Sequence, residues 1–345
     1  MKAVYLTDIR EMEIRDIPEP DLKNSTDVLI KVGTVGVCGS DVHYYTTGRI
    51  GNKVVEYPFI VGHEFAGTVQ ETGADVKHIK KGDRVAVDPG MACGKCDQCL
   101  ANRKHTCRNL RFLGCPGQVD GCLREYIVIP EECCFPVSES ITLEQAVLAE
   151  PLSIGLYALK LSMPIKGKSI AILGAGPIGL SVLVSALAEG AEKIYVTDKI
   201  DTRLNAAQTA GAVWTGNPDK IDIVEEIIKH EPSMLDVVFE CCGQQDALDQ
   251  AVSILKPGGK LLIIGIPETD RISFSPHEMR QREICVQNVR RQNNCVSSAI
   301  NMIESGKTDI DFMITHRFEL NQTKEAFDLV SEYADGVIKA VVEIG

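Results

Sequence analysis

A glycine-rich turn between an apolar strand and an apolar helix limits the fold of this chain more than any other feature. The residues GAGPIG, 174–179, follow the strand-like run SIAIL and open the helix-like run PIGLSVLVSALAEG. A second strand-like run, KIYVTD, ends at Asp198, 19 residues after Gly179. This is the order of the first strand–helix–strand unit of a dinucleotide-binding sheet. It predicts an α/β fold with a doubly wound parallel sheet.

Each glycine of the turn has its own physical reason. Gly174 permits the tight turn, and Gly176 lets the backbone approach a pyrophosphate at the N-terminus of the helix. Gly179 allows the helix to pack closely on the strand. A strand–helix–strand unit that binds no cofactor is the structural alternative.

Asp198 favours NAD over NADP as the dinucleotide. Its carboxylate can bond both ribose hydroxyls, and its charge would repel a 2′-phosphate. Lys199 beside it and Arg203 nearby weaken that preference, because both are cationic.

The pattern of apolar runs changes along the chain and predicts two domains, in line with a length of 345 residues. Residues 1 to about 150 contain short strand-like runs separated by Gly, Pro and Asp. From about 151 to 285, strands alternate with helical stretches, including a helix expected over 245–259. The tail predicts two helices, SSAINMIESG and TKEAFDLVSEYADG, and a closing strand, VIKAVVEIG.

Charge and hydropathy exclude several classes of protein. The net charge of −12 argues against nucleic acid and against an anionic membrane surface as partners. Residues 169–188 are twenty uncharged residues, long enough to span a bilayer, but their glycines and proline favour a strand, a turn and a buried helix. The first twenty residues are charged and lack an apolar signal-peptide core, so we expect a cytoplasmic protein with reduced thiols.

Four of the thirteen cysteines are close together in a polar loop with the spacing C-x2-C-x2-C-x7-C. Four thiolates at this spacing fit a closed tetrahedral zinc site of structural type, and an iron–sulfur cluster is the chemical rival. The ligands would be Cys93, Cys96, Cys99 and Cys107. Apart from Cys38, which is discussed next, we expect the other cysteines to be small buried side chains: Cys115, Cys122, Cys133, Cys134, Cys241, Cys242, Cys285 and Cys295.

A second possible metal site is dispersed along the chain. Cys38 lies in GVCGSDVHYY, His63 and Glu64 lie in VGHEFAG, and Glu150 precedes Pro151. Taken singly, each has an ordinary structural interpretation as a buried thiol, a core histidine or a surface carboxylate. Together they offer one sulfur, one nitrogen and two oxygen ligands. Three protein ligands with an exchangeable water form the pattern of a catalytic zinc site.

These motifs occur in an order that resembles the zinc-dependent medium-chain dehydrogenase/reductase family, and its polyol (sorbitol) dehydrogenase branch in particular. The segments are GVCGSDVHYY, VGHEFAGTV, the loop that carries Cys93, Cys96, Cys99 and Cys107 (called the cysteine lobe from here on), EPLSIG and GAGPIG. The resemblance implies a GroES-like β-rich catalytic domain, residues 1–152 and 287–345. It also implies a Rossmann NAD-binding domain between them, residues 153–286.

The resemblance assigns roles to individual residues. Cys38, His63 and Glu64 match the catalytic zinc motif, and Glu150 matches the acid that ligates the zinc or holds its water. A Glu at 150, where a classical alcohol dehydrogenase would have a Cys, favours the polyol branch. Ser40 and His43 match a proton relay. The other matches are Tyr44, Glu150, Arg290 and Arg291 for substrate, and Gly174, Gly176, Pro177, Ile178, Gly179, Asp198, Arg203, Ile264, Gly265, Ile266, Val289 and Arg290 for cofactor.

The implied activity is hydride transfer between a secondary alcohol of a polyol or sugar derivative and NAD. Two zinc ions per chain, a small-molecule substrate and a homo-oligomer, dimer or tetramer, belong to the same expectation. Rival interpretations are an L-threonine or simple-alcohol dehydrogenase and a non-enzymatic binding or structural protein on the same fold.

One segment departs from the pattern of the polyol branch. In VRRQNNC, 289–295, Arg291 replaces the tyrosine of that branch. Paired arginines suit a carboxylate or phosphate, so a sugar acid or polyol phosphate is an alternative substrate. Arg291 could equally face solvent or the pyrophosphate of the cofactor.

Overall fold

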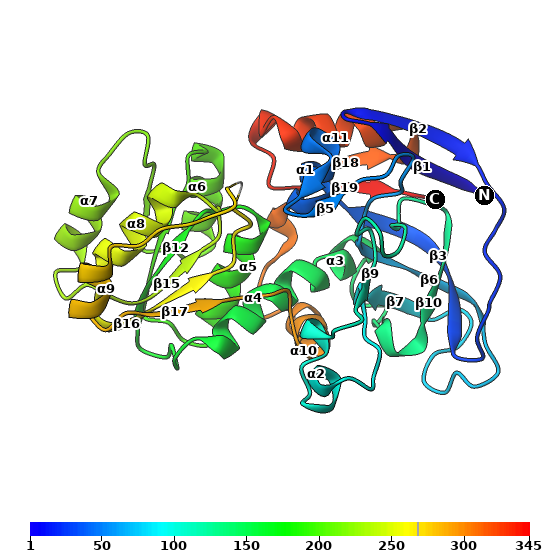
Figure 1. The fold of residues 1–345 in the computed structure, drawn as a ribbon, viewed down its shortest axis with the longest axis horizontal. Helices are drawn as coiled ribbons and strands as arrows, with labels where there is room; N and C mark the ends of the chain where they lie inside the picture. The colour runs from blue at the N-terminus through cyan, green and yellow to red at the C-terminus, as the bar shows by residue number, and fades with distance from the viewer. Residues whose placement is uncertain (268) are drawn as a thin grey trace. The chain divides into compact units, whose positions relative to one another are not determined.

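The computed structural model describes residues 1–267 and 269–345, and the chain divides into two compact units (Figure 1). The first unit contains Met1–Glu150 and Val296–Gly345, and the second contains Pro151–Cys295. The first unit is therefore built from both ends of the chain.

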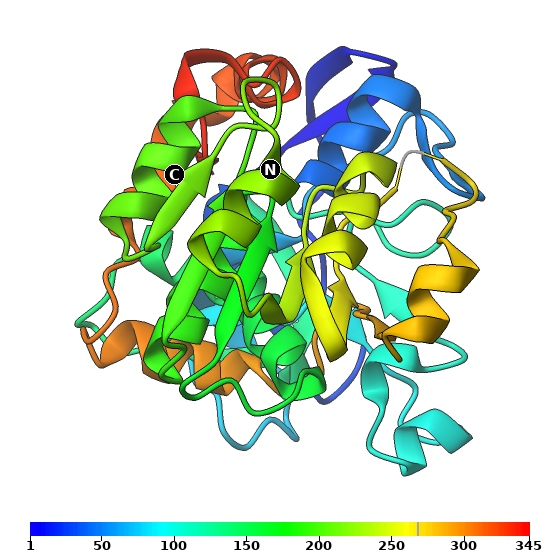
Figure 2. The ribbon, with the colours of Figure 1, turned by 90° about the vertical axis from the view of Figure 1, so that its left-hand side faces the viewer.

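The second unit is a six-stranded parallel sheet with the strand order β14-β13-β12-β15-β16-β17 (Figure 2). This order is that of the doubly wound dinucleotide-binding fold. The α/β class and the doubly wound sheet are confirmed. Its strands are β12 (Ser169–Leu173), β13 (Lys193–Thr197), β14 (Trp214–Gly216), β15 (Leu235–Glu240), β16 (Leu255–Ile263) and β17 (Cys285–Asn288). Its helices are α4 (Ala149–Leu161, which begins in the first unit), α5 (Pro177–Ala188), α6 (Asp201–Thr209), α7 (Ile223–His230), α8 (Gln245–Ile254) and α9 (Pro276–Gln281).

Both faces of this sheet are covered because alternate side chains of each strand point to opposite sides. Ala171 and Leu173 of β12 pack in one cluster with apolar residues of α7 and α8. Ile172 points to the other face, where α5 comes close enough that a Cβ on Gly179 would lie 3.3 Å from it. Continuous apolar strands such as SIAIL are what this two-sided burial requires.

One predicted boundary falls elsewhere in the structure. The helix predicted over 245–259 ends at Ile254, and β16 begins at Leu255, whose backbone is extended (φ −77°, ψ 134°). Pro257 has no N–H to continue a helix, and the two glycines that follow it are poor helix formers.

The first unit is built around a seven-stranded sheet with the order β11-β7-β6-β3-β19-β18, in which β10 also pairs with β3. A separate hairpin is formed by β1 and β2. The strands of the first unit are β1 (Lys2–Asp8), β2 (Glu11–Asp16), β3 (Asp27–Gly36), β4 (Arg49–Ile50), β5 (Lys53–Val54), β6 (Glu64–Thr72), β7 (Arg84–Val87), β8 (Gly90–Met91), β9 (Arg111–Phe112), β10 (Tyr126–Pro130), β11 (Cys134–Pro136), β18 (Ile314–Glu319) and β19 (Lys339–Glu343). Its helices are α1 (Gly39–Thr47), α2 (Asp97–Leu100), α3 (Leu143–Val147), α10 (Val296–Glu304) and α11 (Thr323–Ser331).

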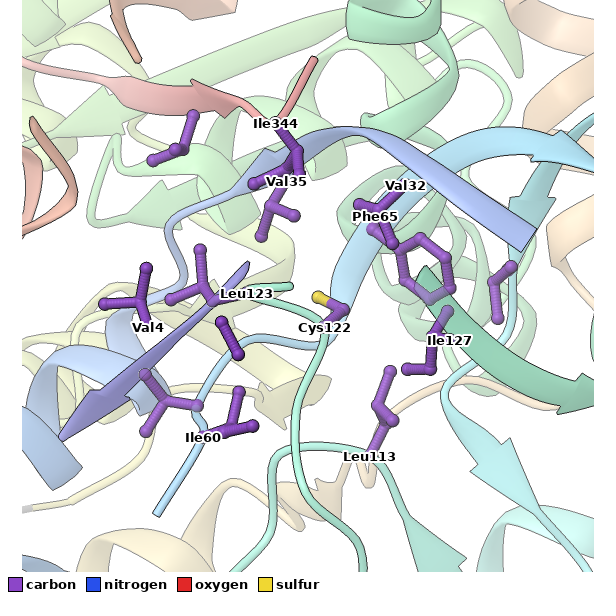
Figure 3. Packing of buried hydrophobic residues seen from close by; sticks show 14 of the residues in the cluster. Val4, Val32, Val35, Ile60, Phe65, Leu113, Cys122, Leu123, Ile127 and Ile344 are labelled. Atoms are coloured by element: carbon purple, nitrogen blue, oxygen red, sulfur yellow. The ribbon is translucent and has the colours of Figure 1, made fainter. Parts of the chain in front are cut away.

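The core of the first unit is assembled from strands far apart in the sequence. Val32 of β3, Phe65 of β6 and Ile127 of β10 meet in one buried cluster (Figure 3). Leu113 and Leu123, from the loops before and after residue 120, join the same cluster. This packing fixes the ends of β3 and β6, where the candidate metal ligands lie.

Within the described residues, no helix is long and apolar enough to cross a membrane. The uncharged stretch 169–188 is divided into β12 and α5, as the sequence analysis favoured.

Gly179 and Gly176 provide a matched pair of stability tests. A Cβ at Gly179 would lie 1.8 Å from the backbone oxygen of Gly174, whereas at Gly176 the only atom within 4 Å is Nη1 of Arg203, at 3.6 Å. We expect Gly179→Ala to lower the free energy of unfolding by at least about 2 kcal/mol, because a backbone clash cannot be relieved by a rotamer change. Gly176→Ala should leave the midpoint of chemical denaturation close to that of the parent. Equal midpoints for the two variants would contradict this packing.

Candidate active site and metal centres

The pairing of β3 with β6 brings three of the predicted metal ligands together. The strands are antiparallel with Gly36 opposite Glu64, so Cys38, just after β3, lies beside the turn that carries His63. Ligand atoms of Cys38, His63 and Glu64 all lie within 4.8 Å of one another. His63 and Glu64 are buried and Cys38 is partly exposed. A thiol, an imidazole and a carboxylate so close together match the donor set of a catalytic zinc.

Asp41, which the sequence analysis missed, holds the histidine of this cluster. Its Oδ1 is 3.2 Å from Nδ1 of His63 and accepts a hydrogen bond of 3.1 Å from the N–H of Gly62. A buried carboxylate on one ring nitrogen orients the imidazole and directs the other nitrogen to a metal. The available signal was an acidic residue three positions after Cys38 in an otherwise uncharged segment.

Protonation in the metal-free cluster follows from its charges. Burial lowers the pKa of His63, but Asp41 and Cys38 raise it by more, to well above the ordinary value. Burial and the neighbouring Glu64 raise the pKa of Glu150 to about 7. Because a metal ligand must be deprotonated, metal binding here releases protons.

Glu150 lies near the cluster without belonging to the group of three. It is 6% exposed and sits in the first turn of α4. Its pKa responds to Glu64, His63 and Lys339, so its carboxylate is close to all of them. Of the two roles that the resemblance offered, this placement supports holding a water or hydroxyl beside the metal.

Helix α1 presents the predicted relay and substrate residues beside the same cluster. Cys38 caps its N-terminus, and the hydroxyl of Ser40 lies 3.4 Å from the Cys38 sulfur. His43 and Tyr44 follow Ser40 at three and four positions, the spacing that puts side chains on one helix face. The Tyr44 hydroxyl is 3.9 Å from the sulfur of Cys115.

A buried lysine completes the cluster and was also missed. Nζ of Lys339, on β19, donates a hydrogen bond of 2.6 Å to Oε2 of Glu64. The signal was a lysine inside the apolar closing strand VIKAVVEIG.

The four cysteines of the cysteine lobe form a second, separate group that could hold a metal ion. Ligand atoms of Cys93, Cys96, Cys99 and Cys107 lie within 4.8 Å of one another. Sulfur–sulfur distances are 3.5 Å for Cys96–Cys99 and 3.8 Å for Cys96–Cys107. Tetrahedral zinc with bonds of about 2.3 Å places its sulfurs about 3.8 Å apart, so the donor set fits the ion. Backbone N–H groups of Lys95 and Cys96 lower the pKa of Cys93 to about 6, which favours the thiolate that a metal needs.

The other cysteines lie outside both groups. Five are buried as predicted: Cys115, Cys122, Cys133, Cys134 and Cys295. Cys241 is partly exposed, and the prediction is wrong for Cys242 and Cys285, which are exposed. Cys242 follows β15 in the turn at the end of the strand, and Cys285 begins the edge strand β17.

The predicted cofactor residues gather at the carboxyl ends of the parallel strands. The turn after β12 holds the glycines, with Gly174 at φ +105° and Gly176 capping α5, whose first residues are Pro177 and Ile178. Ile264, Gly265 and Ile266 follow β16, and Val289 and Arg290 follow β17. This edge is where doubly wound sheets bind their ligands.

Asp198 is tied to the glycine turn. Its two carboxylate oxygens accept hydrogen bonds from the N–H of Ala175, at 2.7 Å, and of Ile200, at 2.9 Å. Each oxygen keeps a further lone pair for a ribose hydroxyl. Arg203 is buried beside Gly176, and Lys199 forms an ion pair of 3.1 Å with Asp219.

Arg290 is exposed and Arg291 is half-buried. The backbone of Arg291 has φ +53°, in the left-handed region that side chains other than glycine seldom adopt.

Comparison with known proteins agrees with the fold and the clusters. Residues 24–139 match the family Alcohol dehydrogenase GroES-like domain, and residues 177–305 match the family Zinc-binding dehydrogenase. Sorbitol dehydrogenase of Bacillus subtilis (strain 168) is 39% identical over 344 residues, covering 99% of this chain and 97% of that protein. L-idonate 5-dehydrogenase of Vitis vinifera is 33% identical over 334 residues, covering 94% and 90%.

A solved structure shows the same fold. A zinc-binding dehydrogenase from Sinorhizobium meliloti 1021, bound to NADP, matches with a TM-score of 0.91 and 31% identity over 99% of both chains. Fold and clusters thus define a two-domain, zinc-binding oxidoreductase with a GroES-like part and a Rossmann-like part. The chain belongs to the zinc-dependent medium-chain dehydrogenase/reductase family.

The two metal centres should lose zinc differently. Four sulfurs would complete the coordination of a zinc ion in the cysteine lobe, whereas Cys38, His63 and Glu64 would leave one position of a zinc ion open. We expect two zinc ions per chain by mass spectrometry, and mild chelation should remove one of them together with activity. Cys99→Ser should lose the chelation-resistant ion, and Cys285→Ser, a control at an exposed thiol, should keep both. Simultaneous loss of both ions from the parent protein would overturn the assignment of roles.

Proposed function

We propose that the protein oxidises a secondary hydroxyl of a neutral polyol or sugar and reduces NAD. The observation that carries this proposal is the cluster of Cys38, His63 and Glu64, with Glu150 beside it, in a chain whose second unit is a dinucleotide-binding sheet. The relative named for sorbitol is consistent with a neutral polyol as substrate, and the relative named for L-idonate, the anion of a sugar acid, is consistent with the second candidate substrate described below.

The side chains have distinct parts in this proposal. When bound, zinc supplies a Lewis acid and NAD supplies the hydride acceptor. Asp41 holds the His63 ring in the orientation that ligation needs. Glu150 holds a hydroxyl or water near the cluster. Ser40 and His43, on one face of α1, provide a route for the hydroxyl proton toward solvent.

The cations of the catalytic cluster, a bound zinc ion and the ammonium of Lys339, would already be offset by its acidic groups, which favours a neutral substrate. Cys38, Glu64 and Glu150 are acidic, and the ammonium of Lys339 is bound to Glu64. An anionic substrate would therefore need a cationic partner outside the cluster. Arg290 and Arg291 are the candidates for that partner. A sugar acid or polyol phosphate is the second candidate substrate, and the half-buried Arg291 next to Arg290 is the observation that favours it, because paired guanidinium groups suit an anion.

NAD is proposed over NADP on the position of Asp198. Its carboxylate lies at the end of β13 and binds the glycine turn, which places a negative charge where a 2′-phosphate would lie. Lys199, which could otherwise attract that phosphate, is paired with Asp219.

The remaining expectations are also proposals. We propose a cytoplasmic homo-oligomer, a dimer or tetramer, and light scattering of the purified protein would test the oligomeric state. The free state of all thirteen cysteines supports a reducing compartment. The domain limits 1–152 with 287–345 and 153–286 remain part of this proposal.

Asp198 should set the cofactor preference. In Asp198→Ala the ribose bonds and the repulsion of a 2′-phosphate are lost, but so is the acceptor for the Ala175 N–H. Asp198→Asn keeps an acceptor and loses the charge, so it separates the two effects. We expect both variants to shift the ratio of kcat/KM for NAD to that for NADP toward NADP by at least about tenfold, or about 1.4 kcal/mol.

The control for this experiment is Glu189→Gln, which removes an exposed negative charge at the C-terminal end of α5, away from the glycine turn. Its cofactor ratio should match that of the parent. An unchanged ratio in Asp198→Asn would mean that another residue selects the cofactor.

Substrate ranking distinguishes the two candidate substrates. We expect neutral polyols to give a higher kcat/KM than the matching sugar acids and polyol phosphates, and Arg291→Tyr to keep that order. Arg280→Tyr, on the exposed surface of α9, is the matched control. A parent enzyme that prefers the anionic compound, with the preference lost only in Arg291→Tyr, would replace the neutral polyol by the second candidate.

A further inference from the structure

Lys339 is a fully buried cation at the catalytic cluster. It lies on β19, it is 1% exposed, and it contacts Glu64, which is also 1% exposed. Its Nζ donates to Oε2 of Glu64 at 2.6 Å and to the backbone oxygen of Val37 at 3.1 Å. Val37 directly precedes Cys38, so one ammonium group contacts both the carboxylate of one candidate ligand and the backbone that leads into another.

Fold stability alone does not account for this lysine. A buried ammonium loses its hydration, and its attraction to one carboxylate often fails to offset that loss. Replacing a buried ion pair by apolar side chains of similar volume is often neutral or stabilising. Every other residue of β19 except the exposed Glu343 is apolar and buried, so an apolar side chain would fit this strand.

The charges around the site indicate what the lysine does. The candidate ligands Cys38 and Glu64 supply at most two negative charges, and the carboxylates of Glu150 and Asp41 at most two more. A divalent ion and the ammonium of Lys339 together carry three positive charges, so they offset most of this negative charge. Glu64 is shared, because its carboxylate offers an atom to the Cys38–His63 group while one of its oxygens accepts from Lys339. A metal and the ammonium therefore draw on the same carboxylate.

We infer that Lys339 is a positioning residue that holds Glu64 and limits the negative charge this carboxylate gives to the catalytic metal. The ammonium of Lys339 lowers the affinity of the site for the metal ion. It also leaves the ion a stronger Lewis acid. This inference rests on the proposed catalytic zinc site.

The test measures zinc release rather than turnover. Zinc-loaded protein is mixed with an excess of a chromophoric chelator, and the rate of loss of the chelation-sensitive ion is recorded. Lys339→Met removes the charge at similar volume, so the metal loses a repelling neighbour and gains the full charge of Glu64. We expect release at least about tenfold slower than in the parent. Lys339→Arg should release zinc at close to the parent rate, and so should Lys31→Met, a control on β3 outside the cluster.

A double-mutant cycle separates positioning from a general loss of structure. In a Glu64→Gln background, Lys339→Met should slow release clearly less than it does in the parent, because the shared carboxylate is absent and only the loss of a repelling charge remains. Lys339→Gln, which keeps an N–H donor without the charge, serves if the methionine variant does not fold. It should also slow release.

Unchanged or faster release in the neutral variants, or the same effect with and without the Glu64 carboxylate, would overturn the inference. A parent protein that binds no second zinc would instead remove the proposed function, so the two failures are distinguishable.

Discussion

The antiparallel pairing of β3 with β6 and with β19 is the constraint on which the candidate active site depends. Gly36 lies opposite Glu64 on one side and opposite Val341 on the other. The chain therefore brings Cys38, the His63 turn and Lys339 together only when three strands from distant parts of the sequence are in register. Gly36 itself must lack a side chain, because a Cβ there would lie 2.5 Å from Oε2 of Glu64.

The buried carboxylates of this cluster each contact a partner that can stabilise their charge. Asp41 is buried and contacts His63, and Glu64 is buried and contacts Lys339. Each of these carboxylates therefore has a cationic or hydrogen-bonding partner in the first unit, as buried charge requires. A zinc ion added to such a site meets ligands that are already oriented, so little reorganisation accompanies binding.

The sequence predicted the second unit well because its local signals agree with its global fold. The apolar run before GAGPIG, the glycines and Asp198 each constrain neighbouring residues, and the sheet follows from their order. The predicted end of the helix over 245–259 was wrong, because β16 begins at Leu255 and pairs with its neighbouring strand from there.

The catalytic cluster could be predicted only in part from local sequence patterns. Cys38 was grouped with the adjacent His63 and Glu64 from their ligand chemistry beside a dinucleotide-binding motif and from the resemblance of ordered motifs, because no short spacing connects Cys38 to that pair. Asp41 and Lys339 carry no motif. Their roles depend on the register of β3 with its neighbours, which single-residue patterns do not specify. The cysteine lobe was the opposite case, since its four ligands lie within fifteen residues of sequence.

The most direct test of the account is a crystal structure of the purified protein with diffraction data collected at the zinc edge. The account predicts two anomalous peaks per chain. One should lie about 2.3 Å from the sulfurs of Cys93, Cys96, Cys99 and Cys107, and the other should be bound by Cys38, His63 and Glu64. A single peak in the cysteine lobe, or a second metal bound without Cys38 and His63, would contradict the central claim.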